Sequence, residues 1–275
     1  MRIGKFTVEP VLDGYANFGV DIEYPEMAAS RWEPWRHLLA DGTDVVNQLG
    51  GYLVRSDDFL ALIDLGFGPS KVEYWHAGEF LNSLEALGVK PEEITDIFFT
   101  HLHFDHIGWA SVDGKPVFPN ATYRCHEADW QHFVSVGHEE RPEESGYPEE
   151  MSAKNKLGPV SGQIALWSES GPVLPGLSVW ATPGHSPGTT VVKIESEGES
   201  AFFIGDVAHH QAELVEPDWQ GVADDDIYLA RQSRQAVARE LATTGTPFLA
   251  AHFRDFEWGN VVETESGLTW KALSA

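Results

Sequence analysis

The sequence predicts an α/β fold in which β-sheets are covered by helices on their outer faces. Short apolar runs rich in Val, Ile, Leu and Phe recur along the chain, separated by Gly, Pro and Asp, which is typical of strands joined by turns. A few longer segments with helical spacing lie between these runs. A chain of 275 residues with 42% hydrophobic content can bury one large core. Because no Ser/Gly linker divides it, we expect a single domain over residues 1–275.

Nine segments are predicted to be strands. In chain order they read KFTVEPVLDG, GGYLVRS, FLALIDLG, DIFFT, LSVWATPG, TTVVKIE, AFFIGDV, PFLAAHF and VVETE. Two of them, FLALIDLG and AFFIGDV, are similar apolar runs that lead to an aspartate, Asp64 and Asp206 respectively. This likeness is what a duplicated sheet would produce.

Three helices are predicted, at residues 73–88, 126–135 and 224–243. The last begins with acidic residues, which favour a helix N-terminus, and has its apolar residues on one side. Two stretches depart from the regular alternation: 14–47 is rich in aromatic residues, and 137–159 is rich in Glu, Pro and Gly. Each is a candidate lid or partner surface. The 14–47 stretch is a candidate wall of a substrate pocket or, alternatively, the interface of a homodimer.

The charge balance limits the classes of partner. The chain has 18 Lys and Arg against 43 Asp and Glu, a net charge of −25, and such a field repels phosphate backbones and anionic bilayers. The N-terminal sequence MRIGKFTVEP lacks the apolar core of a signal peptide, and no run approaches the roughly 20 apolar residues of a membrane span. We therefore expect a cytoplasmic protein with a small-molecule substrate, no nucleic-acid partner and no membrane association.

The stretch THLHFDHIGW, residues 100–109, crowds three histidines and an aspartate into six positions. It follows DIFFT, a continuous apolar run of the kind that forms a buried strand. Alternation carries His101, His103 and Asp105 toward one side. His106 can serve a neighbouring position, so that two cations could share the loop. Imidazole and carboxylate groups are ligands of Zn²⁺ and similar divalent ions. The alternative is a tract of exposed or hydrogen-bonded histidines without metal.

Three further residues at the ends of predicted strands could complete such a site. His185 lies in a Pro-Gly-His-Ser-Pro-Gly turn, Asp206 ends AFFIGD, and His252 ends PFLAAH. A buried carboxylate such as Asp206 is costly unless a cation or hydrogen bonds compensate it. Taken singly, each residue has an ordinary alternative, as a turn histidine, a capping aspartate or a core histidine. The single cysteine, Cys125, excludes a thiolate cluster, so imidazole and carboxylate groups must hold any metal.

These motifs, THLHFDH, PGHSPG, IGD and AHF, resemble the signature of the metallo-β-lactamase superfamily. The resemblance implies an αββα sandwich of two mixed β-sheets flanked by helices, with two divalent metal ions at the shared edge of the sheets. Zn²⁺ is the first expectation, and Mn²⁺, Co²⁺ or Fe²⁺ suit the same ligands. By position, the ligands of one ion would be His101, His103 and His185, those of the other would be Asp105, His106 and His252, and Asp206 would bridge. Asp64, in LIDLG, would supply a hydrogen bond to a ligand.

The residues of these motifs are most similar to those of the branch that contains quorum-quenching lactonases, arylesterases and methyl-parathion hydrolases. This resemblance implies a dinuclear hydrolase of small uncharged esters or lactones, of acyl-homoserine-lactone or aryl-ester type, in which a metal-bridging hydroxide attacks the carbonyl carbon. Asp105 and Asp206 would be the catalytic residues, with Asp105 or a tyrosine protonating the leaving group. The alternatives are an organophosphate triester hydrolase on the same site and a mononuclear iron persulfide dioxygenase. His209 and His210 are expected to have structural roles.

Overall fold

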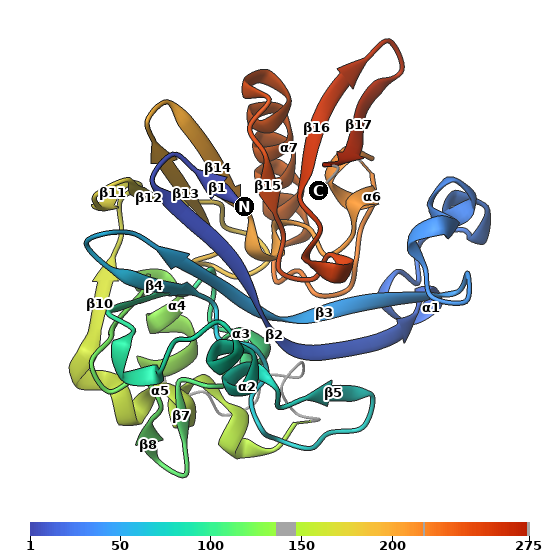
Figure 1. Ribbon diagram of the computed structural model, residues 1–275. Coiled ribbons are helices and arrows are strands. Elements are labelled where there is room, and N and C mark those ends of the chain that lie inside the picture. The colour runs from blue at the N-terminus through green and yellow to red at the C-terminus, as the bar shows by residue number, and fades with distance from the viewer. Residues whose placement is uncertain (136–146, 217, 274–275) are drawn as a thin grey trace.

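Two β-sheets pack face to face with helices on both outer faces (Figure 1). The structure is a computed structural model that describes residues 1–135, 147–216 and 218–273. Both sheets are mixed, because each contains parallel and antiparallel neighbours. The predicted αββα sandwich is therefore confirmed.

The first sheet has eight strands in the order β1-β2-β3-β4-β6-β9-β10, with β5 paired to β2. Their bounds are β1 Arg2–Ile3, β2 Phe6–Gly19, β3 Asp44–Arg55, β4 Leu60–Ile63, β5 Trp75–Ala77, β6 Asp96–Phe98, β9 Thr122–His126 and β10 Ile164–Trp167. Strands β4, β6, β9 and β10 run parallel to their neighbours in this group. The carboxyl ends of β4 and β6 therefore lie at the same edge of the sheet.

The second sheet has seven strands in sequence order, from β11 to β17. Their bounds are β11 Gly171–Leu174, β12 Leu177–Ala181, β13 Thr190–Ser196, β14 Glu199–Phe203, β15 Phe248–Leu249, β16 Gly259–Thr264 and β17 Gly267–Ala272. Only one pair in this sheet, β14 and β15, is parallel, so these two strands also end at one edge. A separate short ribbon joins β7 Ser111–Val112 to β8 Lys115–Pro116.

Helices cover each sheet from outside. The α-helices are α1 Val20–Glu23, α2 Phe80–Ala86, α3 Phe104–Ile107, α4 Glu127–Trp130, α5 Ala153–Leu157, α6 Gln211–Val215 and α7 Ile227–Thr244. The 3₁₀-helices are η1 Ala29–Leu38, η2 Pro91–Glu93, η4 Glu149–Met151, η5 Gly158–Gln163, η6 Gly205–Val207 and η7 Arg254–Phe256, and η3 Gln131–Ser135 is a π-helix. Helix α7 starts at a side-chain cap, where Asp226 accepts from the amides of Tyr228 and Leu229. It ends at Gly245, whose left-handed backbone (φ 64°) suits glycine.

The alternation of side chains along each strand builds three apolar layers. Phe98 in β6 and Phe203 in β14 point into the layer between the two sheets. Ile97 and Phe99, on either side of Phe98 in the sequence, face the layer beneath α2 and α3, which contains Phe80 and Ile107. On the other side of the molecule, Phe202 and Phe248 pack against Val237 and Leu241 of α7. The sandwich is therefore held by continuous burial on both faces of both sheets.

All nine predicted strand segments contain a strand, but the helix predicted at 73–88 is wrong in its first half. Trp75–Ala77 instead form β5, which pairs with Gly14–Ala16 of β2. Gly78, at φ 120°, then turns the chain before α2 begins at Phe80. Tertiary pairing with a long neighbouring strand thus overrides the local helical pattern. The helices predicted at 126–135 and 224–243 coincide with α4 plus η3 and with α7.

The aromatic stretch 14–47 forms the outer ends of the β2–β3 hairpin together with α1 and η1. Its rings pack against a segment of the same chain that follows α6. Trp32 lies 4.9 Å from Trp219 and 5.1 Å from Tyr24, measured between ring centroids. These three rings are buried. In the other predicted excursion, 137–159, residues 137–146 lie outside the described residues. The remainder of it contains η4, α5 and the start of η5.

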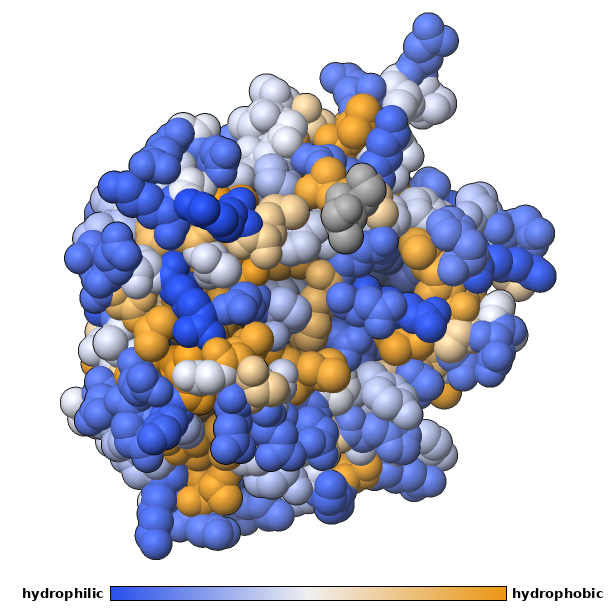
Figure 2. Space-filling view, in the orientation of Figure 1, coloured by the Kyte–Doolittle hydropathy of each residue, from blue (hydrophilic) through white to orange (hydrophobic). Residues whose placement is uncertain are grey.

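Figure 2 shows a mainly hydrophilic face on which hydrophobic residues gather in a band across the middle. None of the helices in the described part of the chain combines the length and apolar character that a membrane crossing requires.

Candidate metal centre

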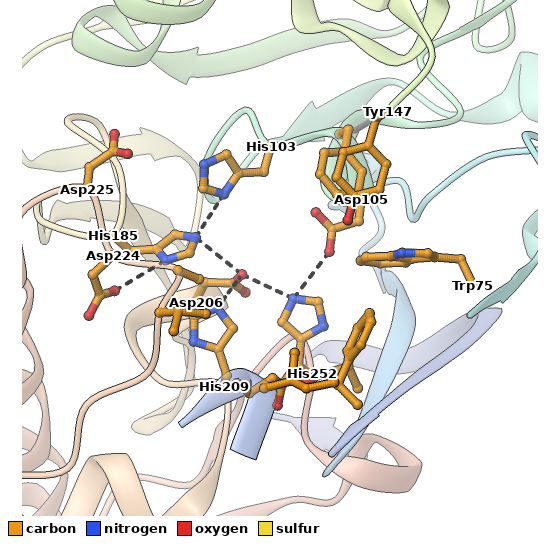
Figure 3. A pocket seen from close by; sticks show the side chains of 17 residues that line it. Trp75, His103, Asp105, Tyr147, His185, Asp206, His209, Asp224, Asp225 and His252 are labelled. Atoms are coloured by element: carbon orange, nitrogen blue, oxygen red, sulfur yellow. Dashed lines mark hydrogen bonds and ion pairs between the residues drawn. The ribbon is translucent and has the colours of Figure 1, made fainter. Parts of the chain in front are cut away.

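The seven residues singled out from the sequence meet at the edge where strands of both sheets end. His101 follows β6, and His103 is the N-cap residue of α3, which starts at Phe104. Asp105 and His106 lie in the first turn of this helix. Asp206 lies in η6 just after β14, and His252 follows β15. His185 lies in the loop between β12 and β13. Figure 3 shows the rings of His103, His185 and His252 directed toward Asp206.

The first group of possible ligands consists of three imidazoles. The Nε2 atom of His101 lies 2.9 Å from Nδ1 of His103 and 3.1 Å from Nε2 of His185. The third distance, from His185 Nε2 to His103 Nδ1, is 2.9 Å. Three nitrogens therefore form a small triangle. One hydrogen can lie between only two nitrogens, whereas a cation placed among them satisfies all three lone pairs.

The second group contains one carboxylate and two imidazoles. The Nε2 atoms of His106 and His252 lie 3.3 Å apart. The Oδ2 atom of Asp105 lies 3.9 Å from the first nitrogen and 3.5 Å from the second. All three residues are buried. The donor set of this group, two nitrogens and one oxygen, also suits a divalent transition metal.

Asp206 lies between the two groups. Its Oδ2 atom is 3.4 Å from His185 Nε2 and 3.7 Å from His101 Nε2 in the first group. The same oxygen is 3.3 Å from His106 Nε2 and 3.1 Å from His252 Nε2 in the second group. The buried Oδ1 atom has no hydrogen-bond partner. A buried carboxylate oxygen without a partner is costly, so this position fits an oxygen that binds a cation.

Hydrogen bonds from behind orient three of the imidazoles. His106 Nδ1 lies 3.0 Å from Asp64 Oδ2, and His185 Nδ1 lies 3.3 Å from Asp224 Oδ1. His252 Nδ1 lies 3.0 Å from the Gln48 carbonyl oxygen. Each acceptor holds the proton on Nδ1 and leaves the Nε2 lone pair directed into the cluster. The sequence argument anticipated the contact of Asp64 and missed those of Asp224 and Gln48.

Asp64 and Asp224 are themselves fixed by other groups. Asp64 adopts a left-handed backbone (φ 60°) and accepts from the amide and hydroxyl of Thr100, at 2.8 and 2.7 Å. Asp224 accepts from the Arg234 guanidinium at 2.9 Å and from Gln220 Nε2 at 2.7 Å. Both carboxylates are therefore rigid, which fixes the rings of His106 and His185 in turn.

The electrostatics keep Asp206 and His101 in the protonation states that bind metal. Burial raises the pKa of Asp206, but the surrounding histidines, His106 and His252 foremost, outweigh it and hold that pKa well below its usual value. Burial and the nearby His106 lower the pKa of His101 well below its usual value. Asp206 is thus a carboxylate and His101 a neutral imidazole, which are the protonation states that bind metal. Burial lowers the pKa of His106, but Asp206 and Asp64 outweigh it and hold that pKa well above its usual value, so a metal has to displace a proton from this ring.

His209 joins the cluster, although the sequence argument gave it a structural role. Its Nε2 atom lies 3.2 Å from Asp206 Oδ2, and its Nδ1 atom lies 3.5 Å from Glu213 Oε2. With His185 and Asp206 it forms a further group of ligand atoms close enough to hold an ion. His210 instead begins α6, where its Nδ1 atom accepts from the Ala212 amide at 3.1 Å. His209 lies three residues after Asp206, past the helical turn η6, and this spacing was the sequence signal that could have placed it in the cluster.

A cavity of about 530 Å³ opens above the cluster. His103, Asp105, Asp206, His209 and His252 form part of its lining. An aromatic wall consists of Phe18, Trp75, Phe104 and Tyr147. The ring of Phe104 lies 4.1 Å from that of Tyr147 and 5.3 Å from that of Trp75, measured between centroids. In Figure 3, Trp75 and Tyr147 lie on the Asp105 side of the cluster, whereas Asp224 and Asp225 lie on the His185 side.

The family model of the metallo-beta-lactamase superfamily matches residues 51–244. The chain belongs to the metallo-beta-lactamase superfamily. This stretch contains six of the seven candidate ligands, all except His252. Members of this superfamily bind divalent metals, and the described His/Asp cluster has the donors to hold them.

Other members of the superfamily resemble the chain over much of its length. Metallo-beta-lactamase domain-containing protein 1 of Mus musculus is 30% identical over 198 residues, which cover 70% of this chain and 60% of the relative. An N-acyl homoserine lactonase of Bacillus cereus is 28% identical over 184 residues, covering 61% of this chain and 66% of the relative. The chain thus matches less than two thirds of the length of either relative.

A solved structure of the superfamily has the same fold. The dizinc quorum-quenching lactonase AidC, in complex with a product N-hexanoyl-L-homoserine, superposes with a TM-score of 0.87 at 24% sequence identity. The match covers 100% of this chain and 97% of that one. At this identity, the likeness concerns the arrangement of the chain.

Proposed function

We propose that this protein is a dinuclear metal-dependent hydrolase of small uncharged esters or lactones. The observation that carries the proposal is the position of Asp206 Oδ2, within 3.7 Å of nitrogens in both groups of ligands. One carboxylate oxygen placed between two ligand groups suits a pair of neighbouring cations. The resemblance to relatives named as N-acyl homoserine lactonases supports the same reaction class.

The chain would hold one ion with His101, His103 and His185. The second ion would be held by Asp105, His106 and His252, and Asp206 would contact both. We propose Zn²⁺ as the native metal, since the donors are imidazole and carboxylate with no thiolate. When bound, such ions supply Lewis acidity and a water whose pKa is lowered to about 7.

The residues around the cluster supply orientation and a proton. Asp105 lines the cavity with Oδ2 3.5 Å from His252 Nε2, so it is fixed beside the reacting centre. Tyr147 also lines the cavity, and burial together with Asp105 raises its pKa to about 12. Its phenol therefore stays protonated at neutral pH and can donate to a leaving alkoxide. His209 is a second candidate donor, because it lies on the cavity lining beside Asp206.

The pocket favours an uncharged substrate with an apolar part. The wall formed by Phe18, Trp75, Phe104 and Tyr147 offers aromatic surface for an acyl chain or an aryl group. The net charge of −25 disfavours capture of anionic diesters. Substrates of acyl-homoserine-lactone or aryl-ester type combine a neutral carbonyl with an apolar substituent, and they match both features.

Metal analysis followed by a substrate panel tests the proposal. We expect about two divalent ions per chain after a chelator-free preparation. The panel compares kcat/KM for acyl-homoserine lactones, simple γ- and δ-lactones, nitrophenyl esters, a cephalosporin and a paraoxon-like triester. A triester that leads by tenfold, equivalent to about 1.4 kcal/mol of transition-state stabilisation, would favour the triester hydrolase instead. A single ferrous ion per chain would favour the persulfide dioxygenase.

A further inference from the structure

A buried carboxylate outside the ligand cluster, that of Asp129, bonds to both loops that supply the first group of ligands. Asp129 lies in α4, and none of its surface is exposed. Its Oδ2 atom accepts from the Leu102 amide at 3.1 Å and from the Ser186 hydroxyl at 3.0 Å. Its Oδ1 atom accepts from the Gly188 amide at 2.6 Å. One carboxylate thus joins two segments that are far apart in the sequence.

The donors on these segments are immediate neighbours of candidate metal ligands. Leu102 lies between His101 and His103, and Ser186 directly follows His185. The nitrogens of the three histidines are separated by 2.9 to 3.1 Å. Two of these nitrogens belong to one segment and the third belongs to the other. The relative position of the two segments therefore sets the size of the triangle that would receive an ion.

The packing around this carboxylate leaves little freedom on the side of the second segment. A Cβ atom added to Gly188 would lie 2.8 Å from both Cγ and Oδ1 of Asp129, so only glycine admits the carboxylate at this distance. The Ser186 amide donates to Thr189 Oγ1 at 2.7 Å, which fixes the turn that contains His185. A shift of the Asp129 carboxylate would therefore move this turn as a unit.

The second group of ligands is oriented through other contacts. His106 Nδ1 faces Asp64, and His252 Nδ1 faces the Gln48 carbonyl oxygen. A change at Asp129 therefore acts on the first group more directly than on the second.

We propose that Asp129 is a positioning residue that assembles the first metal site, by holding the segment of His101 and His103 against the turn of His185. The inference rests on the proposed two-metal function and adds to it a residue outside the ligand set. Loss of a group that orients ligands typically weakens metal binding 10- to 100-fold. A residue that only stabilised the fold would not distinguish between the two ions, whereas Asp129 should affect the first ion selectively.

Asp129→Asn tests the inference, because an amide cannot serve the same donors. Its nitrogen would face the amide N–H of either Leu102 or Gly188, and a main-chain donor cannot become an acceptor. The full-length protein is freed of metal with a chelator and titrated with Co²⁺, whose visible absorption depends on its ligands. The wild type should bind two Co²⁺ per chain. In Asp129→Asn the affinity for one ion should fall about 10- to 100-fold, and the affinity for the other should change less than about threefold.

Two ligand variants identify which ion is weakened. His185→Ala removes a ligand of the first group, and His252→Ala removes a ligand of the second. With one equivalent of Co²⁺, the absorption spectrum of Asp129→Asn should match that of His185→Ala and differ from that of His252→Ala, because the ion then occupies the second site.

A buried carboxylate at the other end of β6 provides the control. Asp96 accepts from the Arg124 guanidinium at 2.7 and 2.9 Å, and Asp96→Asn should leave both Co²⁺ affinities within about threefold of the wild type. Ser186→Ala is a milder variant, which keeps the Asp129 carboxylate and its two main-chain bonds. It should weaken the same ion as Asp129→Asn by at least about threefold. Circular dichroism verifies that each variant is folded.

The outcomes separate this inference from the proposed function. Wild-type affinities in folded Asp129→Asn, equal weakening of both ions, or a spectrum that matches His252→Ala would overturn the role of Asp129 and leave the hydrolase proposal in place. If Asp129→Asn does not fold, an unchanged affinity for both ions in Ser186→Ala overturns it. A wild type that binds two ions and hydrolyses no ester or lactone would instead refute the hydrolase and leave the metal-positioning role standing.

Discussion

The Nε2 atoms of His106 and His252 lie 3.3 Å apart although 146 positions separate the two residues in the sequence. The Nδ1 atom of the first faces Asp64, and that of the second faces the carbonyl of Gln48. When the two rings are neutral, both protons are held at Nδ1 and the two Nε2 lone pairs point at each other. Two such lone pairs repel unless a cation or a proton lies between them.

Removal of metal should therefore lower stability. At a free metal concentration a thousandfold above Kd, binding stabilises the folded state by about 4 kcal/mol, which for a domain of this size corresponds to a fall in Tm on the order of 10 °C on chelation. Calorimetry with and without chelator measures the shift. An unchanged Tm, with loss of metal verified by elemental analysis, would argue against a metal held at this cluster.

Asp206→Ala should reduce metal content and abolish turnover together, because its Oδ2 atom adjoins both ligand groups. We expect kcat/KM to fall by at least a hundredfold. The neighbouring substitution His210→Ala serves as the control. It removes the acceptor for the Ala212 amide and should cost about 1 kcal/mol of stability, with metal content near two per chain. Normal occupancy and activity in Asp206→Ala would show that the bridge is misplaced.

Asp64→Asn should weaken metal binding without removing a ligand. The carboxylate orients His106 from behind, and loss of such a contact typically costs 10- to 100-fold in metal affinity. Asp96→Asn is the matched control, since Asp96 is also buried and accepts from Arg124 at 2.7 and 2.9 Å. It should lower stability and leave metal affinity unchanged. Competition with a chromophoric chelator measures both affinities, and equal values for the two variants would contradict the assignment.

Cys125 should make stability depend on pH only under alkaline conditions. Burial, with a smaller effect from Asp129, raises the pKa of its thiol far above its usual value of about 8.5. The unfolded chain releases this proton at lower pH than the folded chain, so the contribution is complete below about pH 8.5 and is lost as pH rises further. The native thiol should resist iodoacetamide at pH 8.5. Cys125→Ala should lose less stability between pH 8 and 10 than the wild type, and an equal loss in both would contradict this origin.

Much of the fold and of the candidate site follows from local sequence, and the remainder depends on tertiary contacts. The ligand candidates were visible because a dense motif, His101 to His106, follows an apolar strand, and because Asp206 and His252 end similar strands. Strands β9, β10, β11 and β17 were missed, since short segments such as Gly171–Leu174 carry little alternation. β5 exists through pairing with β2.

The pocket could not be predicted at the same level. Phe18, Trp75 and Tyr147 belong to three segments with no local signal of proximity, yet their rings meet in one wall. Fewer aromatic residues of the 14–47 stretch are available for an interface with a second copy, because Tyr24 and Trp32 are buried within the chain. Phe18, Glu23 and Asn47 connect the same stretch to the cavity. A homodimer stays a prediction, which sedimentation velocity can measure.

The division of the ligand cluster between the two sheets has a consequence for the lifetime of the folded state. His101 to His106 belong to the first sheet, whereas Asp206 and His252 follow strands of the second. Contacts between residues so distant in sequence carry a large closure entropy and form late in folding. Metal bound between residues of the two sheets would therefore change the folding rate little and would act mainly by lowering the unfolding rate. Resistance to proteolysis at high protease concentration would then track metal occupancy more closely than the rate of refolding does.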